Sequence, residues 1–373
     1  MKNKLFIVVN VDWFFLSHRL SIALAAMQIY DVYVVAKDTG RRGEIESYGL
    51  KFIDVPFDRS GANLLHELKC IDELRKRYKN YTPDIIHHVT LKASLLGSIA
   101  AKLAKKSKIV NAISGFGYNF TSERKGIKQK VIKYMMKLAF KSKNFHYIFQ
   151  NPNDVEDFTK LQFAPNNHIH LIKGSGVDLS EFAYQEEITK EKVRIILPAR
   201  MLYDKGVVEF IDAAKLLKEK MHSKAEFVLI GNCDTQNLAG IKEEDLEKMT
   251  DTPYLSWIGF QKDIYTALVQ ADIVVLPSYR EGLPKSLIEA CAVGRPIVTT
   301  DTQGCRECVI DGYNGFLIPV KDSDALADKL EVLIDDKALR IQMGINSRKL
   351  AEKDFSIENV IEKHLKIYKE VAK

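Results

Sequence analysis

Short apolar runs alternate with amphipathic stretches along this chain, and the alternation occurs twice. In the first half, apolar runs that we interpret as buried strands cover 5–9, 32–36, 52–55, 85–88 and 109–112, and helical patterns cover 19–27, 64–78 and 94–105. In the second half, the apolar runs are 194–198, 226–230, 255–258, 273–277 and 296–299, and the helical patterns are 207–220, 264–270, 285–291 and 323–334. Such alternation is typical of parallel sheets covered by helices. The sequence therefore predicts an α/β protein with two doubly wound, Rossmann-like domains.

The join between the two halves is marked by residues that break regular structure. Gly174, Ser175, Gly176 and Asp178 follow one another closely near the middle of the chain. At roughly 100–200 residues per domain, a chain of 373 residues has room for two. We expect a first domain at 1–178 and a second at 179–355. Because ligands of open α/β sheets bind beyond the carboxyl ends of the strands, residues that follow strands are the candidates for a site.

The net charge of +6 conceals two halves of opposite sign. Residues 1–180 contain 28 Lys and Arg against 16 Asp and Glu, whereas residues 181–373 contain 27 against 33. The mild total does not indicate a nucleic-acid-binding protein, but the basic first half indicates an anionic surface or an acidic partner. An uneven solvated surface is the alternative.

Cysteine and hydropathy patterns indicate the compartment. The chain has 5 Cys, an odd number without the spacing of a disulfide framework, which favours a reducing compartment. The first apolar run is too short for a signal peptide, and no apolar stretch reaches the roughly 18 residues of a membrane span. We therefore expect a cytoplasmic protein, or one held peripherally on the inner face of a membrane.

The strongest candidate site directly follows the apolar run 273–277. A Gly282-Leu283-Pro284 turn opens a helix there, and backbone N–H groups at the start of a helix bind phosphate well. Glu281 precedes the helix and Glu289 lies in its second turn, so these carboxylates are placed to accept hydrogen bonds from sugar hydroxyls. In the alternative interpretation, Glu281 caps the helix and Glu289 lies on a solvated face.

A second candidate loop, 199–206, follows the apolar run 194–198 and leads into a helix. Arg200 can give a two-pronged hydrogen bond to one phosphate, and Lys205 can place a point charge on the next. Two cations on one strand-to-helix loop are suited to a diphosphate. A solvated charged loop is the alternative.

Two short motifs have simpler explanations than a metal site. Asp322-Ser323-Asp324 has an Asp-x-Asp pattern, but Asp322 is expected to cap the helix that follows. Cys305 and Cys308 have no second pair at zinc spacing, so they are expected to be reduced and structural.

Taken together, the motifs of the second half resemble those of the retaining glycosyltransferases of family 4, whose GT-B fold has two Rossmann-like domains facing across a cleft. The resemblance is carried by Arg-x4-Lys-Gly at 200–206, Glu-Gly-Leu-Pro at 281–284 and Glu-x7-Glu at 281–289. Further matching motifs, within about 173–324, are Leu229-Ile230-Gly231, Trp257-Ile258-Gly259-Phe260, Gly176-Val177-Asp178 and Asp311-Gly312-Tyr313-Asn314-Gly315-Phe316-Leu317.

At the matched positions the resemblance implies a site for a UDP-sugar. Arg200 and Lys205 would hold the donor diphosphate and stabilise it as it leaves. Glu281 would hold hydroxyls of the donor sugar, and Glu289 those of the ribose. The remaining implied donor contacts are Gly282, Leu283, Pro284, Lys285, Gly259 and Phe260. The resemblance also implies that a last helix within 356–373 crosses back to the first domain, and that no metal or cofactor is needed besides the UDP-sugar as co-substrate.

The first half departs from the family pattern. Many members carry a Gly-Gly loop after the first strand, whereas residues 10–19, expected to form a loop here, contain no glycine. Their Phe-Leu-Ser-His-Arg sequence resembles a bacterial subgroup that acts on lipid-linked saccharides. His18 then becomes a catalytic candidate, although it could simply pack at the start of a helix. The acceptor-side candidates are Arg19, Lys92, Gly115 and Gly117.

The stretch 124–143 contains eight Lys and Arg and no acid. Its lysines recur at helical spacing with apolar residues between them, as in helices that lie on anionic lipid. An ordinary helix with a solvated lysine face is the alternative. The candidate membrane-contact residues are Lys128, Lys130, Lys133, Lys137 and Lys141.

We therefore expect a retaining glycosyltransferase that moves a sugar, a hexosamine on the subgroup resemblance, from a UDP-sugar to a polyprenyl-diphosphate-linked saccharide. The product would serve the assembly of bacterial glycans or surface polysaccharides. Its partners would be the nucleotide-sugar, a glycolipid acceptor and an anionic membrane surface, without nucleic acid. The alternatives are a nucleotide-sugar epimerase of the same fold and a non-catalytic sugar-nucleotide-binding protein on the membrane.

Overall fold

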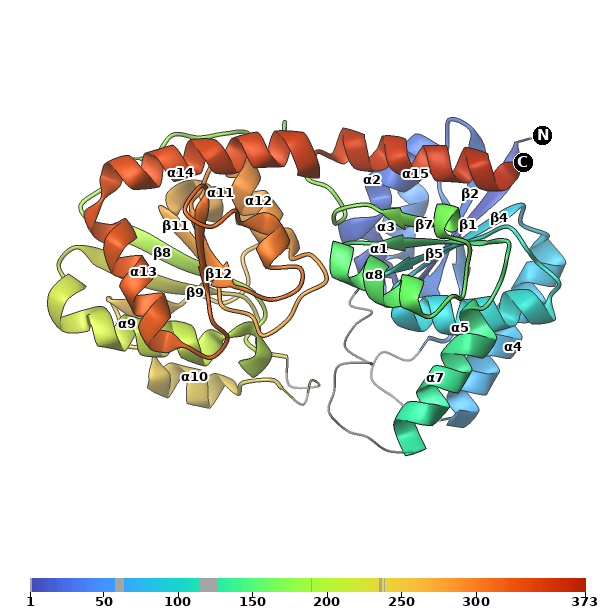
Figure 1. The fold of residues 1–373 in the computed structure, drawn as a ribbon, viewed down its shortest axis with the longest axis horizontal. Helices are drawn as coiled ribbons and strands as arrows, with labels where there is room; N and C mark the ends of the chain where they lie inside the picture. Colours follow the sequence, from blue (N-terminus) through green and yellow to red (C-terminus); the bar gives the residue numbers. More distant parts are fainter. Residues whose placement is uncertain (1, 58–63, 115–126, 189, 235–236, 238) are drawn as a thin grey trace. The chain divides into compact units, whose positions relative to one another are not determined.

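The computed structural model describes the chain apart from residues 1, 58–63, 115–126, 189, 235–236 and 238, and apart from the side chains of residues 127–133. The chain divides into two compact units, one formed by Met1–Ser175 with Glu358–Lys373 and the other by Gly176–Ile357. Each unit has its own parallel sheet with helices on both faces (Figure 1), so the predicted α/β fold class is confirmed.

The first unit is built on a seven-stranded parallel sheet in the order β3-β2-β1-β4-β5-β6-β7. Residues 5–9 of the central strand are fully buried because helices cover both faces of the sheet. The strands are β1 (Asn3–Val11), β2 (Tyr30–Lys37), β3 (Lys51–Asp54), β4 (Ile85–Val89), β5 (Ile109–Ile113), β6 (Phe145–Phe149) and β7 (Ile169–Leu171).

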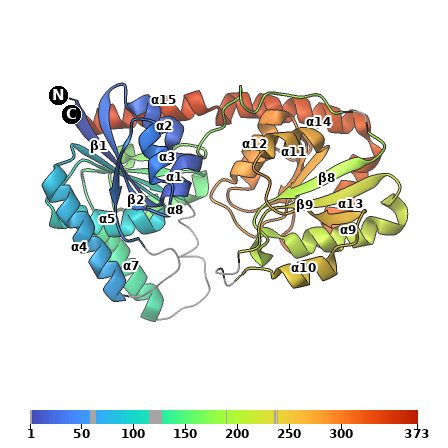
Figure 2. The same ribbon diagram turned by 180° about the vertical axis from the view of Figure 1, so that it is seen from behind.

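Two layers of helices cover this sheet. One face packs against α1 (Asp12–His18), α2 (Leu20–Ala26), α3 (Arg42–Ser47) and the carboxyl-terminal α15 (Ile357–Ala372). The other packs against α4 (Leu64–Tyr81), α5 (Leu91–Leu103), α7 (Ile127–Phe140) and α8 (Pro152–Lys160). Both Figure 1 and Figure 2 show α15 along one face and α4, α5 and α7 along the other. A hydrogen bond between His87 Nδ1 and Tyr368 Oη (2.6 Å) ties α15 to the centre of the sheet.

The second unit is built on a six-stranded parallel sheet in the order β10-β9-β8-β11-β12-β13. Its strands are β8 (Val193–Pro198), β9 (Ala225–Ile230), β10 (Leu255–Trp257), β11 (Ile273–Leu276), β12 (Ile297–Thr300) and β13 (Gly315–Ile318). One face packs against α9 (Val207–Met221), α10 (Glu243–Met249) and α13 (Ser323–Asp335). The other packs against α11 (Ile264–Gln270) and α12 (Lys285–Val293), and α14 (Lys337–Leu350) packs on α12.

The sequence predicted ten of these strands with nearly the same bounds, namely β1–β5 and β8–β12. It did not predict β6, β7 or β13. The strands β7 and β13 are short and have partly exposed residues, so they lack a clear apolar pattern. The strand β6 is fully buried, but its sequence includes a histidine, His146. It was wrong about residues 12–18, which form α1 instead of a loop because the buried Phe15 packs into the core. The predicted cap is confirmed, since the Asp322 carboxylate accepts a hydrogen bond from the Ala325 N–H (2.8 Å). All five cysteines are free.

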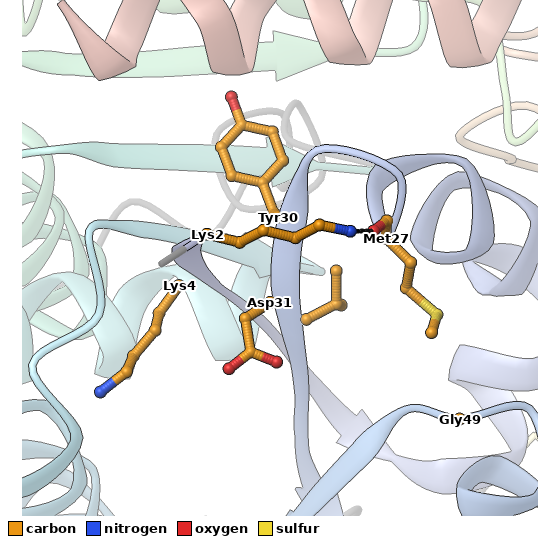
Figure 3. Close-up of a pocket in the computed structure, with 7 residues that line it drawn as sticks. Lys2, Lys4, Met27, Tyr30, Asp31 and Gly49 are labelled. Atoms are coloured by element: carbon orange, nitrogen blue, oxygen red, sulfur yellow. Dashed lines mark hydrogen bonds between the residues drawn. The ribbon is translucent and has the colours of Figure 1, made fainter.

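An open pocket of about 400 Å³ lies at the amino ends of β1 and β2 (Figure 3). Its lysines are already engaged, because Lys2 Nζ donates to the Met27 carbonyl (2.6 Å) and Lys4 Nζ donates to the Tyr81 carbonyl (3.0 Å). Ligands of open α/β sheets bind at the opposite edge. This pocket is therefore not a candidate for the functional site.

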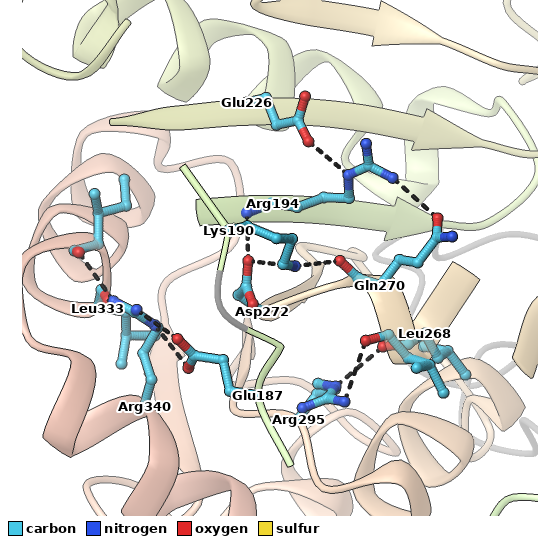
Figure 4. Close-up of polar contacts among 12 residues, drawn as sticks. Glu187, Lys190, Arg194, Glu226, Leu268, Gln270, Asp272, Arg295, Leu333 and Arg340 are labelled. Atoms are coloured by element: carbon cyan, nitrogen blue, oxygen red, sulfur yellow. Dashed lines mark hydrogen bonds and ion pairs between the residues drawn. The ribbon is translucent and has the colours of Figure 1, made fainter. Parts of the chain in front are cut away.

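Polar contacts fix the amino ends of β8 and β11 in the second unit (Figure 4). The Asp272 carboxylate accepts hydrogen bonds from Lys190 Nζ (2.8 Å) and from the Arg194 backbone N–H (2.7 Å). Arg340 makes a two-pronged ion pair with Glu187 (2.7 and 3.1 Å), and these side chains are only 5% and 9% exposed. This edge of the sheet is thus held by contacts within the protein, which leaves the carboxyl edge for ligands.

Candidate functional site

The loop after β8 is held in place by backbone contacts and one glycine. The Ala199 N–H donates to the Ile230 carbonyl (3.0 Å), so the loop continues beside the end of β9. A short turn at Tyr203–Lys205 then leads to Gly206, whose φ of +74° is in the left-handed region. A Cβ at Gly206 would lie 2.2 Å from the Pro277 carbonyl oxygen, so only glycine allows this close approach to the end of β11.

The loops after β8 and β11 are joined to each other because these two strands are neighbours in the sheet. The Asp204 carbonyl accepts hydrogen bonds from the Tyr279 N–H (2.9 Å) and from Ser278 Oγ (3.0 Å). Lys205 Nζ forms an ion pair with Glu281, and the two side chains are 20% and 13% exposed. The structure therefore brings together two residues that the sequence placed in separate motifs.

Arg200 lies on the same loop and is half-exposed. Its guanidinium donates to Asp234 (2.7 Å), a carboxylate from the segment after β9. Asp234 could not be selected from the sequence, because no local motif surrounds it. Arg200 has five N–H donors, so this contact leaves donors for a phosphate.

The start of α12 places a charged pair at the same edge. Pro284, at the N-cap position, gives no side-chain cap to the first helical turn, and the Leu287 N–H donates to the Pro284 carbonyl (3.1 Å). Glu289, in the second turn as predicted, is 5% exposed, which excludes the solvated-face alternative. Lys285 Nζ lies 3.1 Å from Glu289. Burial raises the pKa of Glu289, Lys285 opposes this shift, and Glu181 adds to it.

Gly259 and Phe260 follow β10, the strand that lies beside β9 in the second sheet. The Gly259 carbonyl accepts a hydrogen bond from the Gly231 N–H (2.9 Å), and the Gly231 carbonyl accepts one from Trp257 Nε1 (2.8 Å). Gly259 has a φ of +68° with open space beside it, and Phe260 is 66% exposed. An exposed ring beside an open backbone is suited to contact with a planar base.

A further loop, after β12, supports Glu281 and was not selected from the sequence. The Glu281 N–H donates to the Gln303 carbonyl (3.3 Å). Gly304 has a φ of +82°, and a Cβ there would lie 2.5 Å from the Glu281 carbonyl oxygen. The sequence signal for this loop was Gly304, which lies four residues after the end of the buried strand β12.

These loops together form one polar edge of the second sheet. Arg200, Lys205 and Lys285 each pair with a carboxylate, and Glu289 is the buried member of its pair. Cations beside uncapped helix N–H groups can bind a diphosphate and stabilise negative charge on it. The buried carboxylate can accept hydrogen bonds from vicinal hydroxyls.

His18 and Arg19 lie where α1 ends in the first unit. The His18 ring stacks on Phe14 (centroids 4.1 Å apart), and its Nδ1 lies 2.6 Å from Ser17 Oγ. Arg19 is 5% exposed, and burial lowers its pKa to about 10 although Tyr368 opposes the shift. Its guanidinium donates to the His18 carbonyl (2.7 Å), and among the described residues its Nε has no hydrogen-bond partner.

Arg19 lines a small cavity at the carboxyl ends of β5 and β6, together with Ser114 and Gln150. The cavity volume of about 10 Å³ is close to the space of one water. The structure therefore places Arg19 at the expected edge of the first sheet, but in a space smaller than a sugar. Its acceptor-side role, and the catalytic role of His18, stay predictions.

The remaining candidates of the first unit have mixed positions. Lys92 lies in the first turn of α5 and pairs with Glu67 (2.6 Å). Gly115 and Gly117 lie outside the described residues, as do the side chains of three of the predicted membrane-contact lysines. Those three lysines are Lys128, Lys130 and Lys133. The other two, Lys137 and Lys141, are exposed. In the described part of the chain, no helix combines the length and the apolar character that a membrane span requires.

Comparison with known proteins gives family matches to both halves. A family model described as glycosyl transferases group 1 matches residues 180–350, and one described as glycosyl transferase 4-like matches residues 4–151. The N,N'-diacetylbacillosaminyl-diphospho-undecaprenol alpha-1,3-N-acetylgalactosaminyltransferase of Campylobacter jejuni is 31% identical over 361 residues, which are 92% of either chain. The UDP-Gal:alpha-D-GlcNAc-diphosphoundecaprenol alpha-1,3-galactosyltransferase of Escherichia coli is 28% identical over 91% of this chain and 89% of that one.

Solved structures of similar fold cover nearly the whole chain. HepE of Anabaena, in complex with UDP and glucose, has a TM-score of 0.78 at 17% identity and covers 98% of this chain and 99% of its own. WaaG, a glycosyltransferase involved in lipopolysaccharide biosynthesis, has a TM-score of 0.76 at 17% identity with the same coverage. At this level of identity the likeness concerns the fold.

Proposed function

The chain belongs to the group 1 glycosyltransferases and has their GT-B fold. From this premise, we propose that it transfers a sugar from a UDP-sugar to a saccharide linked to polyprenyl diphosphate. The transfer retains the configuration of the anomeric carbon. The observation that carries the proposal is the joining of the loops after β8 and β11, which sets Lys205 beside Glu281 next to the start of α12. Support for the acceptor and the donor comes from the names of the two relatives, which mention diphospho-undecaprenol and UDP-Gal.

Arg200 and Lys205 bind the donor diphosphate in this proposal. The ammonium group of lysine has three donors, so Lys205 can keep its bond to Glu281 and still reach phosphate oxygens. As the bond to the sugar breaks, negative charge grows on the diphosphate, and these cations with the α12 N–H groups stabilise it. Each such donor typically contributes a factor of about 10²–10³ to the rate.

The two glutamates hold the two sugars of the donor. Glu289 accepts hydrogen bonds from the ribose hydroxyls, and Glu281 accepts them from the transferred sugar, a hexosamine in this proposal. Because Glu281 is paired with Lys205, its carboxylate is a weak nucleophile. This pairing favours attack of the acceptor from the face that the diphosphate leaves, with retention, over a glycosyl-enzyme intermediate of the kind formed by retaining glycosidases. The proposed reaction uses no metal and no further cofactor.

The first unit binds the glycolipid acceptor and contacts the inner face of the membrane in this proposal. Tyr134, Lys137 and Leu138 are exposed in the last two turns of α7, and Lys141 is exposed directly after the helix. A helix face that exposes both apolar side chains and lysines is suited to an anionic lipid surface, where the apolar groups enter the interface and the cations bind headgroups.

The transfer reaction is tested with purified protein, a panel of UDP-sugars and a polyprenyl-diphosphate-linked saccharide. We expect UDP release that depends on the acceptor, and a product whose new linkage is α by NMR. UDP-sugar interconversion without an acceptor would instead indicate the epimerase, and nucleotide binding without turnover would indicate the non-catalytic protein.

Membrane contact is tested separately by sedimentation with liposomes that contain anionic lipid. Reversing the charge of Lys137 and Lys141 to Glu should lower the bound fraction. The matched control reverses Lys215 and Lys349, which are exposed in the second unit, and should leave binding unchanged. Equal binding of both double variants would contradict the proposed membrane contact.

A further inference from the structure

Three histidines gather at one edge of the first sheet, away from the residues assigned above. His170 lies in β7, and His168 ends the short 3-10 turn that precedes this strand, with its ring stacked on that of His146. His170 is paired in register with Ile148 of β6, and His146 lies two residues before Ile148 on the same face of the sheet. Helix α15 packs on this face and brings Glu370 to it.

The ligand atoms of this cluster are close enough to share one cation. His146 Nδ1 lies 3.0 Å from His170 Nε2. One ring nitrogen from each of these histidines and one Glu370 oxygen all lie within 4.8 Å of one another. Tetrahedral zinc with Zn–N bonds of about 2.0–2.1 Å separates two ligand nitrogens by about 3.3 Å. The two histidines thus need only a small adjustment to bind the same ion.

The surroundings of the cluster disfavour a positive charge on its imidazoles. Burial, with His168 and His170 nearby, lowers the pKa of His146 to about 4. Burial also lowers the pKa of His170, which Glu370 opposes, while His168 and Lys366 lower it further. Lys366 is the group that works against a bound cation.

A further nitrogen lies beside this pair. The His168 ring stacks on His146 with centroids 4.0 Å apart. Its Nδ1 is buried and has no hydrogen-bond partner in the part of the chain that the structure describes. A buried ring nitrogen without a partner costs free energy unless water or an ion satisfies it.

We propose that His146, His170 and Glu370 bind a divalent transition-metal ion of the zinc type, with His168 or water completing the tetrahedron. Imidazole nitrogens with one carboxylate are a ligand set suited to zinc. The site joins β6, β7 and the last turns of α15, where the negative end of the helix dipole adds to the attraction for a cation. The ion would therefore fix the carboxyl-terminal helix to the first sheet and take no part in glycosyl transfer.

The test uses the full chain without a histidine tag, stripped of metal by a chelator and dialysed. Titration with Co²⁺, followed by its visible absorption, should show one tetrahedral ion per chain, and calorimetry with Zn²⁺ should give the same stoichiometry. His170→Ala and Glu370→Gln should each weaken binding by at least about tenfold, since even partners outside the ligand shell change metal affinity by about 10–100-fold. Zn²⁺ should raise the Tm of the wild type, but not that of His170→Ala.

The matched control is His222→Ala, an exposed histidine of the second unit, which should bind metal as the wild type does. Glu370 is exposed, so Glu370→Gln is expected to fold even if His170→Ala does not. Absence of stoichiometric binding, or equal affinities for wild type, His170→Ala and Glu370→Gln, would overturn the proposal. None of these measurements depends on transferase activity.

Discussion

Replacing Glu289 by glutamine tests two effects of its buried carboxylate, one on UDP binding and one on the stability of the protein. Glu289 is 5% exposed in the second turn of α12, and glutamine keeps the size of this side chain but not its charge. In the proposed donor site, the ribose hydroxyls donate to this carboxylate. A hydrogen bond to a charged group contributes about 1.5–3 kcal/mol, against about 0.5–1.5 kcal/mol for a neutral pair. We therefore expect UDP affinity to fall by about 1–2 kcal/mol, which is about 5- to 30-fold.

The same substitution should stabilise the protein without nucleotide. Burial raises the pKa of Glu289, with Lys285 opposing, so the folded state holds a proton more tightly than the unfolded state. The free energy of unfolding then decreases as pH rises from the ordinary value of 4.5 through the raised pKa, and this loss persists at pH 7. Glu289→Gln has no such titration. Its unfolding free energy at neutral pH should exceed that of the wild type, since Lys285 is 35% exposed and stays hydrated without a partner.

Calorimetry with UDP and urea unfolding, each between pH 5 and 8, measure the two effects. Wild-type affinity for UDP should decline toward the acid end as Glu289 is protonated, whereas that of Glu289→Gln should not follow this titration. The control Glu226→Gln removes a carboxylate that pairs with Arg194 (2.6 Å) at the amino ends of the strands, and it should bind UDP normally. Unchanged UDP affinity in Glu289→Gln, or a lower unfolding free energy, would refute the reasoning.

Three further outcomes are expected. Gly206→Ala combines a left-handed φ of +74° with a clash against the Pro277 carbonyl, whereas Gly312→Ala has a φ of +72° and open space. In urea unfolding, both variants should lose about 1–2 kcal/mol of unfolding free energy because alanine disfavours this backbone conformation. Only Gly206→Ala should lose a further amount from the clash, and equal losses in the two variants would contradict it. Burial lowers the pKa of His364 from 6.5 to about 3, so the free energy of unfolding decreases as pH falls below 6.5. His364→Leu should reduce the slope of unfolding free energy against pH, between pH 6 and 4, by about 1.36 kcal/mol per pH unit. The same change at an exposed histidine should leave this slope unchanged. Lys205→Met should lower kcat by about 100-fold or more with an unchanged circular dichroism spectrum, and normal turnover would remove it from the catalytic site.

Local patterns determined most of the fold. The apolar runs of β1 and β8 predict buried strands by themselves, because a strand that helices cover on both faces consists mainly of apolar residues. The motifs after β8 and β11 likewise selected Arg200, Lys205, Glu281 and Glu289 as candidates, since the strand pattern alone locates the segments that follow these strands. The edge strand β7 and the helix α1 were not identified, because their stability depends on packing with distant segments.

The tertiary structure decided which of these residues meet. Glu281 lies 76 residues beyond Lys205, and they pair because β8 and β11 are neighbours in a sheet whose order differs from the chain order. The burial of Glu289, and therefore its raised pKa, depends on everything that packs around α12. The cluster of His146, His170 and Glu370 exists only because α15 returns to the first sheet. The order of strands in a sheet and the packing of α15 on the first sheet depend on contacts between residues far apart in the chain. A local sequence pattern does not encode which distant segments will meet.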